Sequence, residues 1–307
     1  MAAPRIWLFE SEVVDIVWKM PAWREISRCP KEIIMKYSDA FDILPAAWLT
    51  SKDEWWPSHI ARSAWLEHTP FAAWLMPKLA PKVIVELGTH LAVSYMAFCQ
   101  ANARLANPAK CFAVDTWQGD EHAGKYDSSV FQEVTRLNSQ YDRFSTLLRG
   151  RFDEALPNFP DGTVDLLHID GFHTYEAVSK DFHSWLPKMS QRGGMLFHDT
   201  AVRERDFGVW RLWGELSQRY PHFDFSHGHG LGVLIVGAEA PKEPHQLCAL
   251  MDDRAAKAKV RKFFSVRGRE VSKRYEEMVD MQASSPLLSK YSRKLKKILR
   301  KLMPRRK

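Results

Sequence analysis

Two segments near the middle of the sequence, HIDGFHTYE and LFHDT, combine histidine with aspartate. The first contains His168, Asp170 and His173, and the second contains His198 and Asp199. Histidine can accept a proton near neutral pH because its ordinary pKa is about 6.5. Carboxylates can instead hold a divalent cation, which lowers the pKa of a nearby hydroxyl and orients it. Both patterns are suited to activating a hydroxyl group as a nucleophile.

Apolar runs that alternate with helical patterns must position these residues. The runs cover residues 83–87, 111–115, 145–150, 164–170 and 193–199, and helical spacing follows at about 93–106, 152–159, 174–189 and 207–220. Strands that alternate with helices predict a parallel sheet with right-handed crossovers. The Gly-rich segment FDFSHGHGLGVLIVG predicts an antiparallel hairpin at its edge. The expected fold is therefore α/β, with a doubly wound and mostly parallel sheet.

Four acids lie at or near the carboxyl ends of these predicted strands, namely Glu86, Asp115, Asp170 and Asp199. Ligands of open α/β sheets bind outside the carboxyl ends of the strands. Any one of these acids could be an ordinary polar strand end, but four at one edge favour a ligand site.

The turn after the first run, GTHLAVS, narrows the choice of ligand. It lacks the GxGxxG pattern of dinucleotide folds, and a GK[ST] phosphate loop is absent too. A ligand poor in phosphate fits better, with one acid near its amino group and another near its ribose. S-adenosylmethionine suits such an acid-lined pocket because its sulfur and its ammonium group are cationic.

The segments VELGTHLAVSY, AVDTWQGDEHAG, HIDGFHTYEAVSKDF and LFHDT together resemble the class I S-adenosylmethionine-dependent methyltransferases. The resemblance covers about residues 55–237. It is strongest to the bacterial branch associated with surface-polysaccharide and glycosyltransferase functions. It implies a Rossmann-like fold, S-adenosylmethionine as cofactor and methyl transfer to a hydroxyl group.

The resemblance also implies which residues bind the cofactor: Glu86, Gly88, Thr89, Ser94, Asp115, Thr116, Trp117 and Asp153. Glu86, Gly88 and Ser94 would border the methionine part, and Asp115 would bind the ribose hydroxyls. Arg151 to Asp153, after the third predicted strand, would lie near the adenine. Trp117 would lie beside the adenosine, with an ordinary packed or surface aromatic as the alternative.

One residue of the turn departs from the family pattern. Ala92 stands where the family usually has a second glycine. If the backbone there is right-handed or extended, the change is harmless. If φ is positive, alanine costs roughly 1 kcal/mol or more and weakens the turn that binds the cofactor.

Related sugar and catechol O-methyltransferases hold Mg²⁺ with an acid after the fourth strand and acids or amides after the fifth. Asp170 and Asp199 occupy those positions and are the expected ligands of Mg²⁺ or Mn²⁺. No third ligand is evident, because Thr200 follows Asp199. The alternative is a metal-free site in which His173 and Asp170 are the catalytic residues and His173 is the base. His168 lies within a strand and is expected to be structural.

Charge and cysteine content bound the other possibilities. The net charge is +7, but ten Lys or Arg and no acid lie within residues 281–307, which leaves about −3 for the rest. This distribution disfavours DNA binding by the body of the chain. The four cysteines are far apart and form no CxxC pair, which argues against a thiolate zinc site and indicates a reducing compartment. With no signal peptide or spanning segment evident, we expect a cytoplasmic protein.

Three regions are predicted along the chain. Residues 1–54 form a helical extension, residues 55–240 the S-adenosylmethionine-binding domain and residues 241–307 a helical region. Within the last of these, residues 281–307 form a basic amphipathic helix that suits an anionic membrane surface or an acidic partner, with a solvated tail as the alternative. Aromatic residues are dense in residues 55–79, where they either pack in the core or cover an acceptor site.

The predicted function is O-methylation of a hydroxyl, on a sugar of a polysaccharide or glycolipid, with the tail at the inner membrane face. Two alternatives remain open. One is a methyltransferase for an oxygen or nitrogen of a small-molecule acceptor. The other is a non-catalytic, membrane-recruited module of a glycan assembly complex.

Overall fold

The computed structural model describes residues 55–120, 124–204 and 206–284. They belong to one compact unit that spans Asp42–Lys307. The predicted helical extension at 1–54 and most of the predicted basic tail, residues 285–307, lie outside the described residues. Among the described helices, none combines the length and the apolar character needed to cross a bilayer.

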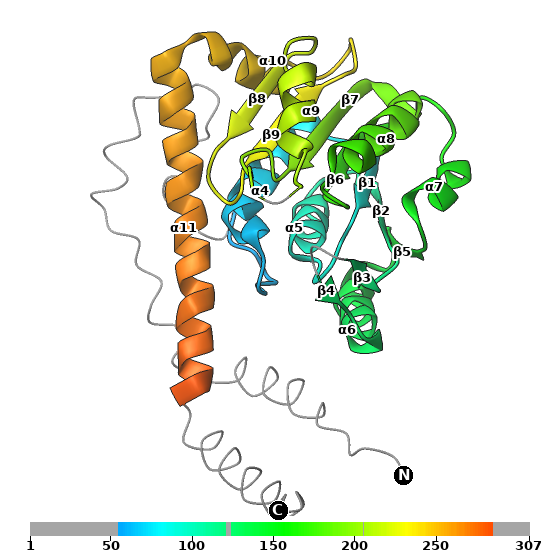
Figure 1. Ribbon diagram of the computed structural model, residues 1–307, viewed down its shortest axis with the longest axis vertical. Coiled ribbons are helices and arrows are strands. Elements are labelled where there is room, and N and C mark those ends of the chain that lie inside the picture. The colour runs from blue at the N-terminus through cyan, green and yellow to red at the C-terminus, as the bar shows by residue number, and fades with distance from the viewer. Residues whose placement is uncertain (1–54, 121–123, 205, 285–307) are drawn as a thin grey trace, which may run out of the picture. The chain divides into compact units, whose positions relative to one another are not determined.

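Seven strands of the described part form one sheet in the order β5-β2-β1-β6-β7-β9-β8 (Figure 1). The first five in this order are parallel, whereas β9 is antiparallel to both of its neighbours, β7 and β8. The strands are β1 (Val83–Leu87), β2 (Lys110–Asp115), β5 (Ser145–Arg149), β6 (Val164–Ile169), β7 (Met189–His198), β8 (His222–Phe225) and β9 (Leu231–Ile235). A separate pair joins β3 (Gly119–Asp120) and β4 (Gly124–Lys125). The predicted doubly wound, mostly parallel sheet with its antiparallel hairpin is confirmed.

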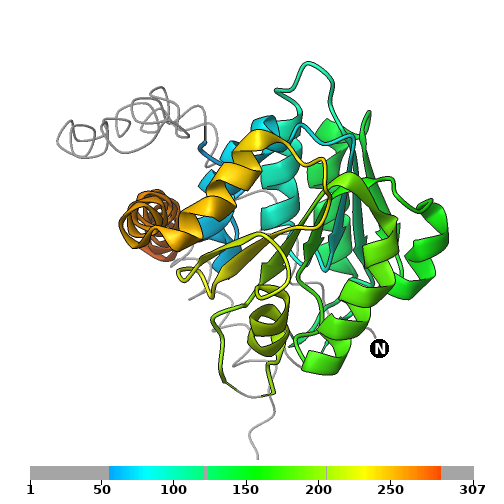
Figure 2. The ribbon, with the colours of Figure 1, turned by 90° about the horizontal axis from the view of Figure 1, so that it is seen from above.

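Helices cover both faces of this sheet (Figure 2). Helices α4 (Thr69–Leu79) and α5 (Val93–Asn102) lie on one face, and α7 (Phe152–Ala155), α8 (Tyr175–Trp185) and α9 (Val209–Leu216) pack against the other. The remaining helices are α6 (Ser128–Asn138), α10 (Lys242–Ala249) and α11 (Arg254–Ser284). Short 3₁₀ turns are η2 (Ala64–His68), η3 (Ser139–Tyr141), η4 (Leu156–Asn158), η5 (Leu186–Lys188) and η6 (Leu250–Asp252).

Helix α5 ends four residues earlier than its sequence pattern predicts. The side-chain amide of Asn102 donates to the carbonyl oxygen of Ala109 at 2.9 Å and accepts from its N–H at 2.7 Å. Because this amide bonds to the backbone just before β2, the chain turns at Asn102 instead of continuing as helix. Helix α6 was not predicted, because only Val134 and Asn138 of its residues are buried.

The aromatic segment before β1 belongs to the core. Trp55, Trp65 and Trp74 are at most 2% exposed. Phe71, in α4, packs on Phe264 of α11 with ring centroids 5.4 Å apart. Of the two interpretations of this segment, core packing is therefore the one that the structure supports for these side chains.

The strand order reverses on either side of β1, which lies between β2 and β6. Gly88 follows β1 with a φ of 86°, and a Cβ at this position would collide with the carbonyl oxygen of Asp170. The N–H of Asp170 in turn donates to Leu87 at 2.8 Å. The turns after β1 and β6 are therefore in direct contact at the switch point, where ligands of such sheets bind.

Ala92 has a left-handed backbone, with φ 61° and ψ 25°, at the N-terminus of α5. Its side chain is fully buried, and its N–H donates to the carbonyl oxygen of Thr89 at 2.7 Å. Of the two conformations considered for Ala92, the structure therefore has the one with positive φ, in which alanine is unfavourable. An alanine in this conformation is less favourable than glycine by roughly 1 kcal/mol.

We expect Ala92→Gly to raise the free energy of unfolding by up to about 1 kcal/mol, because glycine adopts positive φ without a Cβ clash. Urea unfolding followed by circular dichroism measures the change. Ala97→Gly, inside α5, is the matched control and should lower stability by about 1 kcal/mol. An Ala92→Gly protein less stable than the wild type would contradict the strain at this turn.

Candidate active site

A cavity of about 380 Å³ opens at the carboxyl edge of the sheet. Most of the predicted cofactor and catalytic residues line it: Gly88, Thr89, Ser94, Asp115, Thr116, Asp153, Asp170 and His173. The sequence patterns did not single out several others, among them Ser63, Tyr126, Lys180 and Asp181. Cavities of this size hold ligands of the size of a nucleoside derivative.

Asp115 holds the turn that forms one wall of this cavity. Its Oδ2 accepts the backbone N–H groups of Thr89 at 2.7 Å and His90 at 3.0 Å, and its Oδ1 accepts that of Trp117 at 2.7 Å. A carboxylate has about four lone-pair positions, so one is left for a hydroxyl in the cavity. The carboxylate therefore fixes the turns after β1 and β2, and it has the remaining capacity that a ribose hydroxyl needs.

Trp117 does not line the cavity. The indole is 1% exposed and packs on Phe131 with centroids 4.8 Å apart, while its Nε1 donates to the carbonyl oxygen of His90 at 3.3 Å. The expected place beside an adenosine is therefore not where the structure puts this side chain. Instead, the residue packs beneath the turn, which is the alternative stated above.

Glu86 also lies behind the cavity, although we expected it at the methionine end of the cofactor. It is fully buried, and its Oε2 is 2.9 Å from Nδ1 of His168. Trp65 donates its indole N–H to Nε2 of His168 at 3.0 Å, so the imidazole proton must lie on Nδ1, which donates to Glu86. Burial raises the pKa of Glu86, and the hydrogen bond from His168 opposes that rise. The structural role predicted for His168 agrees with this geometry.

The donor set of the cavity fits S-adenosylmethionine. Oγ1 of Thr89 is buried and lacks a hydrogen-bond partner among the described residues, which suits a polar ligand atom beside the turn. Ser94 adds a hydroxyl at the start of α5, and Asp115 and Asp170 add carboxylates that suit the ribose and the ammonium group. These residues would hold the cofactor.

Charged side chains close the end of the cavity after β5. Asp153 pairs with Arg151 at 3.2 Å and with Lys180 of α8 at 2.9 Å. Hydrogen bonds from Arg151 and Lys180 hold the pKa of Asp153 well below its usual range. This carboxylate therefore stays ionised at every physiological pH.

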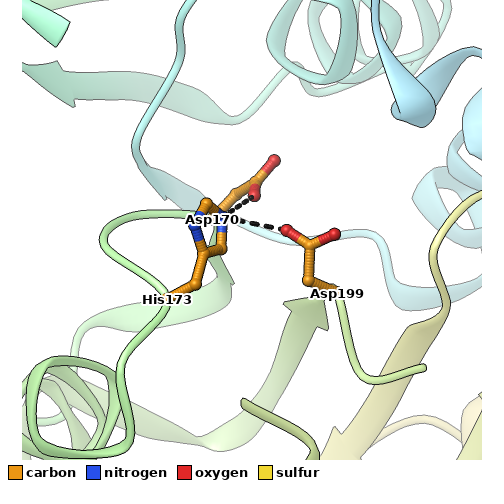
Figure 3. Close-up of side chains that lie close together, drawn as sticks. All are labelled: Asp170, His173 and Asp199. Carbon is orange, nitrogen blue, oxygen red and sulfur yellow. Dashed lines mark ion pairs between the residues drawn. The ribbon is translucent and has the colours of Figure 1, made fainter. Parts of the chain in front are cut away.

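Asp170, His173 and Asp199 converge at the ends of β6 and β7 (Figure 3). Nε2 of His173 lies 2.9 Å from Oδ2 of Asp199 and 3.6 Å from Oδ1 of Asp170. The ring of His173 stacks on Phe207 at a centroid distance of 4.5 Å, which fixes its orientation. One ligand atom from each of the three residues lies within 4.8 Å of the others, a separation suited to a single metal ion.

Two further histidines surround this cluster. Nδ1 of His198 lies 3.2 Å from Asp170 and 3.3 Å from Asp199, and its Nε2 donates to the carbonyl oxygen of Gly228 at 3.0 Å. Nδ1 of His229 lies 3.2 Å from Asp199. Both histidines therefore support the carboxylates of the cluster by direct contacts.

Two protonated histidines balance the negative charges of Asp170 and Asp199 in this cluster. Burial lowers the pKa of His173, but hydrogen bonds to Asp170 and Asp199 outweigh burial and raise it to about 9. Burial likewise opposes protonation of His198, and the same two carboxylates reverse the effect, so its pKa lies well above the ordinary value. At neutral pH both imidazoles are cationic and cannot accept a proton. His173 is therefore a poor base in this state. Its ligand atom lies within 4.8 Å of those of both carboxylates, so the imidazole is a candidate for the missing third metal ligand once it loses its proton.

Arg203 and Trp210 contact each other in the part of the chain that follows β7. The guanidinium of Arg203 lies 4.8 Å from the centre of the Trp210 ring and donates to the carbonyl oxygen of Thr200 at 2.9 Å. Arg205 lies outside the described residues.

We expect Asp115→Ala to abolish binding of S-adenosylhomocysteine and to lower the free energy of unfolding by about 2–3 kcal/mol, because three backbone N–H groups lose their acceptor. Asp115→Asn should be intermediate, since its single oxygen can keep only part of these bonds. Titration calorimetry and urea unfolding measure the two effects. The exposed Asp142→Asn is the control and should match the wild type; normal binding by Asp115→Ala would contradict this role.

A curated relative and several solved structures resemble the chain. The uncharacterized protein y4gI of Sinorhizobium fredii is 54% identical over 177 residues, which is 58% of this chain and 20% of the relative. This chain thus matches only about a fifth of the length of that relative.

Among solved structures, the O-methyltransferase TomG of Streptomyces achromogenes, bound to S-adenosylmethionine, is 14% identical, with a TM-score of 0.44, and the match covers 73% of this chain and 96% of TomG. The methyltransferase PaMTH1 of Podospora anserina is also 14% identical, with a TM-score of 0.42 over 76% of this chain and 99% of that protein. At TM-scores below 0.5 these likenesses carry no argument about the acceptor.

The match to a protein family is more direct. Residues 85–200 fit the family model described as a methyltransferase domain. This range contains the turn after β1, Asp115 and the cluster at the ends of β6 and β7. The match to a methyltransferase domain thus covers the strands and turns that supply the cluster and most of the cavity wall.

Proposed function

We propose that this protein transfers a methyl group from S-adenosylmethionine to a hydroxyl group of an acceptor. The observation that carries the proposal is the convergence of Asp170, His173 and Asp199 next to the acid-lined cavity. Asp170 and His173 line the cavity and also belong to the cluster. The methyl donor and the group that activates a hydroxyl would therefore be neighbours.

Gly88, Thr89 and Ser94 would hold the methionine part of the cofactor, and Asp115 would accept from its ribose. S-adenosylmethionine supplies an electrophilic methyl group on a sulfonium. The chain contributes position: the turn after β1 touches the loop after β6, so the cofactor and the reactive carboxylates share one wall. Such positioning can account for a large part of a two-substrate rate enhancement.

Asp170, His173 and Asp199 would bind Mg²⁺ or Mn²⁺. Two carboxylate oxygens are hard ligands that suit these ions, and the imidazole supplies a third position once it loses its proton. A divalent cation held there would lower the pKa of an acceptor hydroxyl. His198, in contact with Asp170, and His229, in contact with Asp199, would keep these carboxylates in place by hydrogen bonds.

For the acceptor we propose a sugar hydroxyl, as in a polysaccharide or glycolipid. The resemblance of the four sequence segments to the polysaccharide-associated branch supports this choice. A vicinal pair of hydroxyls, common in sugars, also suits chelation at a site with open positions. A small-molecule alcohol is the alternative acceptor, and assays with both classes discriminate between them.

The first test measures cofactor binding and methyl transfer together. We expect micromolar binding of S-adenosylhomocysteine, and methyl transfer to sugar acceptors that stops with EDTA and returns with Mg²⁺ or Mn²⁺. Asp170→Asn and Asp199→Asn should each lower the transfer rate about 100-fold or more, and Asp199→Asn should retain cofactor binding. Mass spectrometry of the methylated product measures the rate.

Asp161→Asn serves as the control, because this carboxylate pairs with Lys188 at the surface, away from the cavity. It should keep the wild-type rate. Wild-type protein that binds no S-adenosylhomocysteine would contradict the proposed function and would favour a non-catalytic module with the strained Ala92 turn as its cause. Full activity in EDTA would contradict the proposed metal requirement but would be compatible with the proposed cofactor.

We further propose that the basic segment 281–307 brings the enzyme to an anionic membrane surface, where lipid-linked glycans would be at hand. Ten Lys or Arg with no acid, interspersed with apolar residues at helical spacing, support the proposal.

Co-sedimentation with vesicles tests this second proposal. We expect binding to vesicles that contain phosphatidylserine, weakening as salt rises, and no binding to pure phosphatidylcholine. Deletion of residues 285–307 should remove the binding and leave the affinity for S-adenosylhomocysteine unchanged. Equal binding by the full and the truncated chains would contradict a membrane role for the tail.

A further inference from the structure

Asp181 is a lining residue of the cavity that the function described so far does not use. It lies on α8, on the helix face that it shares with Ala177 and Lys180, both of which also line the cavity. Arg151 to Asp153, which follow β5, line the same end. Asp181 is therefore placed away from β7 and Asp199, at the end of the cavity where β5 terminates.

The cofactor would lie across the strand ends in a fixed direction. Gly88 and Asp170 follow β1 and β6, next to the reactive cluster, and Asp115 ends β2 in the middle. The adenine would then reach the end after β5, where Phe152 offers an aromatic ring. A Cβ on Gly171 would collide with that ring, so Phe152 is fixed tightly at this end.

The carboxyl of Asp181 is half-buried and makes no hydrogen bond or ion pair within the described part of the chain. Its charged neighbours are Lys180 on α8 and Asp153 on α7. Lys180 pairs with Asp153 at 2.9 Å, and Asp153 also pairs with Arg151. Both cations therefore pair with Asp153, and Asp181 faces the cavity without an ion pair to either of them.

Burial raises the pKa of Asp181 to about 7, with Lys180 opposing the rise and Asp153 adding to it. A neutral carboxylic acid presents an O–H donor and a C=O acceptor side by side. The edge of adenine that bears the amino group presents the complement, since an N–H donor lies next to a ring nitrogen acceptor. An ionised carboxylate could accept from the amino group, but it would repel the lone pair of the ring nitrogen.

We propose that Asp181, as a neutral carboxylic acid, binds the amino-bearing edge of the cofactor's adenine, so that cofactor binding is coupled to proton uptake. This inference rests on the proposed function, because it requires the adenosine to lie in this cavity. Affinity should fall as pH rises through the pKa of the free protein, where the carboxyl ionises. Between pH 6 and pH 8 the loss should reach up to about tenfold.

Titration calorimetry with S-adenosylhomocysteine at pH 6, 7 and 8 tests the inference. Runs at pH 7.5 in two buffers of different ionisation enthalpy measure proton uptake, which should be between zero and one per cofactor. Asp181→Asn keeps a donor beside an acceptor but cannot ionise, so we expect near-wild-type affinity at pH 6 and a pH-independent profile. Asp181→Ala should bind more weakly at pH 6 and lack the pH dependence as well.

The exposed Glu176→Gln, also on α8, is the matched control and should keep the wild-type affinity and slope. Thermal unfolding shows whether each variant is folded. If the wild type binds S-adenosylhomocysteine but Asp181→Asn retains its full pH dependence, the inference is wrong and the proposed function stands. If the wild type does not bind at any pH, both are wrong. A flat Asp181→Asn profile that stays tight at pH 8 supports Asp181 as the adenine-binding acid.

Discussion

The contact between Gly88 and the Asp170 peptide is the constraint on which the rest of the site depends. A Cβ at position 88 would occupy the place of the Asp170 carbonyl oxygen, and the N–H of Asp170 bonds back to Leu87. The turn after β1 and the loop after β6 are therefore held together by backbone atoms. Because one of these segments lines the cofactor cavity and the other contributes to the reactive cluster, their distance is set by main-chain geometry.

Charge is balanced in two different ways at the two ends of the cavity. Near β7, two carboxylates share two cationic imidazoles, His173 and His198, in a cluster that a divalent cation could reorganise by displacing a proton. Near β5, Arg151 and Lys180 both pair with Asp153, and Asp181 has no ion pair within the described part of the chain. The first arrangement favours a metal, and the second favours a neutral acid. The difference between the two ends depends on which carboxylates form ion pairs.

A series of buried hydrogen bonds supports the strands next to the cavity. Trp65 donates to His168, and His168 donates to Glu86, so a 3₁₀ turn before the sheet is joined to two central strands. Satisfied buried hydrogen bonds of this kind specify one arrangement of the core, because breaking one leaves a costly unpaired group. The strained Ala92 turn, adjacent to this region, is held in place by such surroundings rather than by its own preference.

The sequence by itself determined the strands, their alternation with helices and the acids at the strand ends, because these depend on local hydrophobic periodicity. It also placed Asp170, His173 and Asp199 after neighbouring strands. It could not decide which way Glu86 and Trp117 face, because a side chain at a strand end can turn to the core or to the cavity. Only the tertiary structure shows His173 between two carboxylates, Asp181 of α8 beside Asp153, and a positive φ at Ala92. Those features arise from contacts between segments far apart in the chain, and local sequence patterns therefore do not predict them.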